Sequence, residues 1–233
     1  FNDTFMETTK MTSLTQAIDA GLRNYMIGIY NRMTIGLVLT GLVGFIMATV
    51  PSLAALYQTW VVWPMILVPL AFVLVMSMNK DNMSAGSLKA LFYGYAATVG
   101  LSTGLFFMVY TVNSILIAGA VTAATFGAMS LYGYTTKADL TKMGSFLMMG
   151  LIGILIAMVV NIFLGSTMMT MIISAAAVIV FTGLTAYDTQ ALVKAYDTSD
   201  IDRSMTMGAL TLYLDAINLF YNILILLGAP KKD

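Results

Sequence analysis

The fold is decided by residues 205–227, which read MTMGALTLYLDAINLFYNILILL. This segment is long enough to cross a bilayer as a helix, because a span needs about 20 apolar residues. Asp215 lies near its middle, where a carboxylate costs roughly 2.5–3.5 kcal/mol on insertion scales. Charged residues inside membrane spans are rare and mark ion paths or proton relays, so Asp215 is a candidate functional residue.

A stripe of small and polar side chains follows one face of this segment. Its members recur at steps of three and four residues, which is the spacing of one helix face. The other faces are apolar, so we expect this helix in the middle of a bundle, with the stripe facing other helices or a water-filled path. The stripe consists of Ser204, Gly208, Thr211, Asp215, Asn218 and Asn222.

Composition places the whole chain in a membrane. Hydrophobic residues make up 59% and charged residues only 9%, whereas soluble domains carry about 25% charged residues. The formal net charge of zero gives no basis for binding nucleic acid. The chain contains no cysteine and no histidine, so we expect no metal site or cofactor built on them and no enzyme activity. Carboxylates would have to perform any pH sensing.

Six further apolar segments precede residues 205–227, which predicts an all-α integral membrane protein with seven transmembrane helices. Residues 1–32 are expected to form a cytoplasmic tail with an amphipathic interfacial helix, or alternatively a polar lead-in to the first span. Residues 33–228 form the predicted transmembrane domain, and 229–233 a short C-terminal tail. The six predicted spans are 33–50, 60–78, 88–110, 114–134, 143–163 and 168–187.

Basic residues are distributed unevenly over the predicted loops. Nine of the eleven lysines and arginines fall on one side when alternate loops are compared, so the positive-inside rule predicts a cytoplasmic N-terminus. A complete seventh span would place Lys231 and Lys232 on the opposite side, whereas a re-entrant last segment would place all eleven inside. The length of the last segment favours a complete span.

Asp188, at the cytoplasmic end of the sixth span, is the expected partner of Asp215. Two carboxyl groups that share a proton titrate as a unit, and neutralising them would change the contact between two helices. Thr185, three residues before Asp188, adds to a polar face on the sixth span. Alternatively, Asp215 is a neutral packing residue beside Asn218, and Asp188 is an ordinary carboxylate at a helix end.

The two segments that hold these aspartates resemble the C-terminal signature of the Bax inhibitor family, the transmembrane Bax inhibitor motif proteins. Residues 183–190 read GLTAYDTQ, and residues 208–220 read GALTLYLDAINLF. The resemblance covers about residues 20–228. Three further stretches are similar to the bacterial, alphaproteobacterial-type branch of the family: 20–25 (AGLRNY), 123–140 (AATFGAMSLYGYTTKADL) and 144–153 (GSFLMMGLIG).

The resemblance implies a last helix surrounded by the other six. It also implies a pH-sensitive calcium-permeable leak channel, with calcium as the permeant ion and with Asp188 and Asp215 as the gating and pH-sensing pair. A separated, deprotonated pair would open the path, and a singly protonated, hydrogen-bonded pair would close it. Some relatives bind a membrane AAA protease, so a regulatory or interaction subunit of another membrane complex is the alternative function. The implied location is a bacterial inner membrane, or alternatively the mitochondrial inner membrane.

The sequence departs from this family at the residue that holds the aspartate pair. Characterised bacterial relatives carry an arginine at the cytoplasmic end of the second helix. Residues 78–82 read MNKDN here, so Lys80 is the candidate substitute. A lysine offers a point charge but no bidentate contact. The resemblance therefore leaves open how the pair is held.

Overall fold

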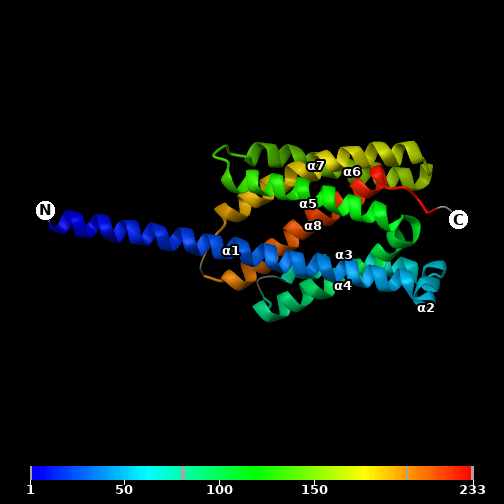
Figure 1. Ribbon diagram of the computed structural model, residues 1–233, viewed down its shortest axis with the longest axis horizontal. Helices are drawn as coiled ribbons and strands as arrows, with labels where there is room; N and C mark the ends of the chain where they lie inside the picture. Colours follow the sequence, from blue (N-terminus) through cyan, green and yellow to red (C-terminus); the bar gives the residue numbers. More distant parts are fainter. Residues whose placement is uncertain (1, 80–81, 198, 232–233) are drawn as a thin grey trace.

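The computed structural model describes residues 2–79, 82–197 and 199–231, with side chains from residue 19 onward (Figure 1). Its described elements are all helical, and seven of them are long and apolar enough to cross a membrane. This result confirms the predicted all-α, seven-helix class. The elements are α1 (Asn2–Thr49), α2 (Pro51–Ala54), η1 (Ala55–Gln58), α3 (Val62–Asn79), α4 (Ala85–Val109), α5 (Val112–Thr135), α6 (Thr141–Leu164), α7 (Thr167–Lys194) and α8 (Ile201–Leu227).

The first helix begins well before the predicted boundary between tail and membrane domain. α1 runs without a break from Asn2 to Thr49, and its part that could span a membrane is Asp19–Thr49. Tyr25, Met26 and Ile29 are already buried in the core of the bundle. The apolar face on which the interfacial helix was predicted therefore packs against other helices of the bundle. The helix continues without a break across the predicted boundary between residues 32 and 33.

Side-chain caps and one glycine set several helix boundaries. Ser84, Thr111 and Ser166 each accept a hydrogen bond from the backbone N–H three residues later, at 3.1–3.2 Å. These caps satisfy donors that the first turn of a helix leaves free. Gly165 ends α6 with a φ of 60°, a left-handed conformation that glycine adopts without a Cβ penalty. Local sequence therefore fixes where four of the long helices begin or end.

α8 is the most buried of the seven long helices, since half of its most apolar stretch of 18 residues is buried inside the protein. It packs chiefly against α7 and α1, and also against α5 and α4. α3 packs mainly on α4, and α6 mainly on α7 (Figure 1). Gly208 allows part of this close packing, because a Cβ there would lie 2.8 Å from Ile29 Cδ1 and 3.0 Å from Leu192 Cδ2. Four helices thus form the main contacts of α8, rather than all six.

The last helix runs through the full length of the bundle. It begins beside the end of α7, and its far end meets the junction of α4 and α5 (Figure 1). There the Lys231 N–H donates to the Val109 carbonyl at 2.8 Å, and the Thr111 N–H donates to the Ala229 carbonyl at 3.2 Å. The last segment is therefore a continuous helix and not a re-entrant loop.

Candidate functional site

Asp188 on α7 and Asp215 on α8 meet inside the bundle, and their carboxyl groups are hydrogen-bonded to each other. Asp215 is only 4% exposed, whereas Asp188 is half-buried. Two carboxylates so close repel each other strongly when both are ionised. The arrangement therefore suits a pair that holds one proton between its two members.

Close backbone packing positions the α7 side of the pair. A Cβ at Gly133 of α5 would lie 2.2 Å from the Ala186 carbonyl oxygen, so only glycine allows this approach. Beside Asp188, Thr189 forms a hydroxyl pair with Ser130 at 2.9 Å, and Ser130 pairs with the Tyr30 hydroxyl at 2.5 Å. This chain of hydroxyl groups joins α7 to α5 and α1 one residue away from Asp188.

The polar residues predicted to support the pair bond mainly to their own helices. Each donates to the carbonyl four residues earlier: Thr211 at 3.2 Å, Asn218 and Asn222 at 2.8 Å, and Thr185 at 2.8 Å. Such bonds satisfy polar side chains within the membrane without a partner on another helix. These four residues therefore lie on the two helices of the site. The hydroxyl donors of Thr185 and Thr211 are occupied, whereas each asparagine amide carries a second N–H.

A buried arginine, which the sequence places at the end of the predicted N-terminal tail, lies beside the first turns of α8. Arg32 of α1 is 9% exposed and donates to Thr206 Oγ1 and to the Asp202 carbonyl, both at 2.5 Å. It also forms an ion pair with the Asp202 carboxylate. Its spacing from Tyr25 and Ile29, by steps of three and four, could have placed it on the buried face of α1. The predicted substitute, Lys80, lies outside the described residues.

Further hydrogen bonds fix α8 to its neighbours along its length. Ser204 pairs with Tyr25 of α1 at 2.8 Å, Tyr213 pairs with Thr40 of α1 at 2.5 Å, and Tyr221 pairs with Thr103 of α4 at 2.6 Å. Polar pairs of this kind join helices inside a membrane, where the apolar lipid provides no hydrophobic driving force for association. Together with Arg32, they attach α8 to α1 and α4.

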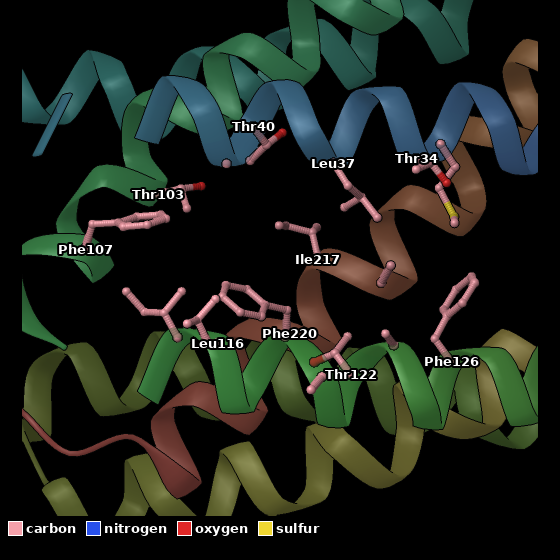
Figure 2. Close-up of a pocket in the computed structure, with 17 residues that line it drawn as sticks. Thr34, Leu37, Thr40, Thr103, Phe107, Leu116, Thr122, Phe126, Ile217 and Phe220 are labelled. Carbon is pink, nitrogen blue, oxygen red and sulfur yellow. The ribbon is translucent and has the colours of Figure 1, made fainter. Parts of the chain in front are cut away.

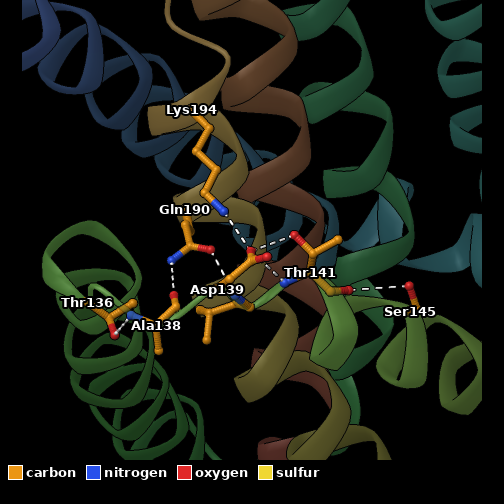
Figure 3. Close-up of polar contacts among 8 residues, drawn as sticks. Thr136, Ala138, Asp139, Thr141, Ser145, Gln190 and Lys194 are labelled. Atoms are coloured by element: carbon orange, nitrogen blue, oxygen red, sulfur yellow. Dashed lines mark hydrogen bonds and ion pairs between the residues drawn. The ribbon is translucent and has the colours of Figure 1, made fainter.

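A separate polar cluster attaches the α5–α6 connection to the end of α7 (Figure 3). Gln190 donates to the Ala138 carbonyl at 2.7 Å and accepts from the Leu140 N–H at 3.0 Å. Lys194 pairs with the exposed Asp139 at 2.8 Å. Hydrogen bonds from Lys194 and Thr141 lower the pKa of Asp139 from 3.8 to about 2. This cluster holds the last turns of α7, immediately after Asp188.

The described residues contain no group of three or more acidic, histidine or cysteine side chains that could hold a metal ion. A tight calcium site needs six to eight oxygen ligands, and the aspartate pair supplies two carboxyl groups. The pair alone therefore provides fewer oxygen ligands than a tight calcium site needs.

Comparison with known proteins identifies the family. A family model described as "Inhibitor of apoptosis-promoting Bax1" matches residues 22–232. The chain is 45% identical over 217 residues to the inner membrane protein YbhL of Escherichia coli K12, which covers 90% of this chain and 93% of YbhL. It is 35% identical to an uncharacterized protein of Caulobacter vibrioides, covering 100% of this chain and 99% of that protein, and 38% identical to one of Rickettsia prowazekii, covering 96% and 97%. The chain, with its seven apolar helices and paired aspartates, therefore belongs to the Bax inhibitor family of membrane proteins.

Proposed function

We propose that this protein is a pH-sensitive, calcium-permeable leak channel of the bacterial inner membrane, gated by Asp188 and Asp215. The observation that supports this proposal is the direct contact of the two carboxyl groups between α7 and α8, inside the bundle. A relative that is named an inner membrane protein supports the location. The distribution of basic residues supports a cytoplasmic N-terminus.

The proposed gate depends on one shared proton. While the proton is present, the hydrogen bond between Asp188 and Asp215 holds α7 against α8. When it leaves, two negative charges face each other, and at 4 Å and an effective dielectric constant of about 20 their repulsion is about 4 kcal/mol. That energy is comparable to the contacts that hold two helices together, so deprotonation would separate α7 from α8 near the pair.

The neighbouring contacts suggest which helix would move. Arg32, Thr40 and Thr103 attach α8 to α1 and α4 through hydrogen bonds. Thr189 and Gln190 attach α7 to α5 and to the α5–α6 connection. We therefore expect α7 to shift together with these elements, relative to an α8 that stays with α1 and α4. The separated carboxylates would leave a negative interior that attracts cations. Lower pH closes this path and higher pH opens it.

Calcium flux in proteoliposomes tests the proposal. The wild-type protein should pass several-fold more calcium at pH 8 than at pH 6, whereas Asp188→Asn and Asp215→Asn should lose most of that pH dependence. Asp19→Asn is the matched control, because Asp19 is exposed near the start of the first span. Flux that is absent at both pH values, or equal pH dependence in all four proteins, would overturn the proposed function.

A further inference from the structure

An apolar cavity of about 680 Å³ lies beside α8, between α1 and α5 (Figure 2). Figure 2 shows Leu37 of α1, Leu116 and Phe126 of α5, and Ile217 and Phe220 of α8 around it. α1 packs on α4 and α8, while α5 packs on α7 and α8. The space between α1 and α5 is lined mainly by apolar side chains, together with four threonines.

A second cavity, of about 630 Å³, continues the first along the same two helices. Both cavities are lined by Met33, Thr34 and Phe126. Together they follow α1 from Arg23 to Gly41, a length of about 27 Å at 1.5 Å per residue. That length is close to the roughly 30 Å of a bilayer hydrocarbon core. We call this continuous space the α1–α5 groove.

The α1–α5 groove is apolar through the bundle and basic at one end. Arg23 is exposed at that end, four residues after the start of the first span, and has no ion pair with another described residue. Tyr30 and Tyr134 line the same part of the groove and add hydroxyl groups. A positive group at the membrane interface attracts lipid phosphate, while apolar cavities stay dry and accept apolar ligands.

We propose that the α1–α5 groove is a binding site for one anionic glycerophospholipid, with its phosphate at Arg23 and an acyl chain along Leu37, Leu116 and Phe126. In a bilayer, the acyl chain is the apolar molecule that surrounds the protein. The groove matches its polarity and is long enough to hold it, because one acyl chain spans about half of the ~30 Å core. The acyl chain would also contact Ala216 and Ile217, which follow Asp215 in α8. This inference is independent of the proposed channel function.

Two glycines provide substitutions that should fill the groove without a clash. A Cβ at Gly119 or at Gly41 would meet no heavy atom within 4 Å, and both residues line the 680 Å³ cavity. Gly153 has the same free space but lies on α6, outside the groove. Gly119→Leu and Gly41→Leu therefore test the groove, and Gly153→Leu is the matched control.

Native mass spectrometry can measure the binding, with the purified protein titrated with phosphatidylglycerol or with phosphatidylcholine of identical acyl chains. The wild-type protein should hold one phosphatidylglycerol about fivefold more tightly than phosphatidylcholine, which corresponds to about 1 kcal/mol for one basic residue at the surface. Arg23→Gln should abolish that preference, whereas Lys142→Gln, at an exposed lysine, should keep it. Gly119→Leu should weaken binding of both lipids, and Gly153→Leu should not.

Three results would overturn the lipid site: equal affinity of the wild-type protein for both lipids, an unchanged preference in Arg23→Gln, or equal lipid binding by Gly119→Leu and Gly153→Leu. Size-exclusion chromatography verifies that each variant is folded. If Gly119→Leu does not fold, Gly41→Leu provides the same test from α1, and the Arg23→Gln result stands on its own.

Discussion

Arg32 of α1 donates hydrogen bonds of 2.5 Å to Thr206 Oγ1 and to the Asp202 carbonyl, 170 residues or more away in α8. The guanidinium is almost fully buried, and the Asp202 carboxylate balances its charge. A buried charge is tolerated only where its donors are satisfied. Arg32 therefore joins the first helix to the first turns of the last helix.

Replacement of Arg32 by leucine should lower the free energy of unfolding by about 1.5–3 kcal/mol, the usual range for hydrogen bonds to charged groups. Thr206 and Asp202 would lose their shared partner. Denaturation in mild detergent, followed by circular dichroism, measures the change. The control is Arg23→Leu, since Arg23 is exposed and its loss should change stability by less than about 0.5 kcal/mol. Equal stability of the two variants would contradict the assigned role of Arg32.

The ion pair of Asp139 with Lys194 should respond to acid. The folded pKa of about 2 lies below the ordinary 3.8, so the stabilisation is complete above pH 3.8 and is lost as the pH falls toward 2. Between pH 4 and pH 2, backbone amides of residues 137–140 should exchange hydrogen faster. Above pH 5 the exchange should follow only the intrinsic base-catalysed rate.

Hydrogen exchange monitored by mass spectrometry measures this response. In Asp139→Asn the same amides should exchange fast already at pH 5, because the asparagine cannot form the ion pair with Lys194 at any pH. Protection that stays the same in both proteins from pH 5 to pH 2, after correction for intrinsic rates, would show that the pair does not hold the α5–α6 connection.

Gly133→Ala should both destabilise the protein and disturb the aspartate pair. The added Cβ would lie 2.2 Å from the Ala186 carbonyl oxygen, so α5 and α7 must separate. The expected loss is about 1–3 kcal/mol, as for other overpacked sites, and the shift in α7 lies two residues from Asp188. Gly153→Ala, at an unobstructed position on α6, should be neutral or slightly stabilising. Thermal unfolding of both variants in detergent distinguishes them, and equal melting temperatures would refute the close contact.

Thr122 presents the opposite case, a substitution that should be tolerated. Its Oγ1 is buried without a hydrogen-bond partner among the described residues, and it lines the apolar cavity. A buried hydroxyl without a partner costs about 1–3 kcal/mol. Thr122→Val, which keeps the shape and removes the hydroxyl, should therefore match or exceed the stability of the wild-type protein. Thr40→Val should destabilise it, because Thr40 bonds to Tyr213 and to the Ala96 carbonyl. A destabilised Thr122→Val variant would mean that the hydroxyl has a partner.

The sequence alone determined the seven long helices and singled out Asp188 and Asp215. Both results depend on local properties. The length of an apolar segment can be compared with the thickness of a bilayer, and a carboxylate inside such a segment is conspicuous because of its insertion cost. The start of the first helix was less well predicted, because the face of Tyr25 and Ile29 is amphipathic whether it meets lipid headgroups or other helices.

Only the tertiary structure decided which faces of these helices meet. In a membrane, side chains that face lipid and side chains that face other helices are both apolar. Mean hydropathy therefore does not separate α8, which is half buried, from α3, which lies at the outside. The contact of Arg32 with Thr206 joins residues 174 positions apart, and no local pattern specifies it. The α1–α5 groove likewise depends on how two helices rest on α8. The physical reason is that helix formation depends on neighbours along the chain, whereas helix packing depends on shape and hydrogen bonding between distant segments.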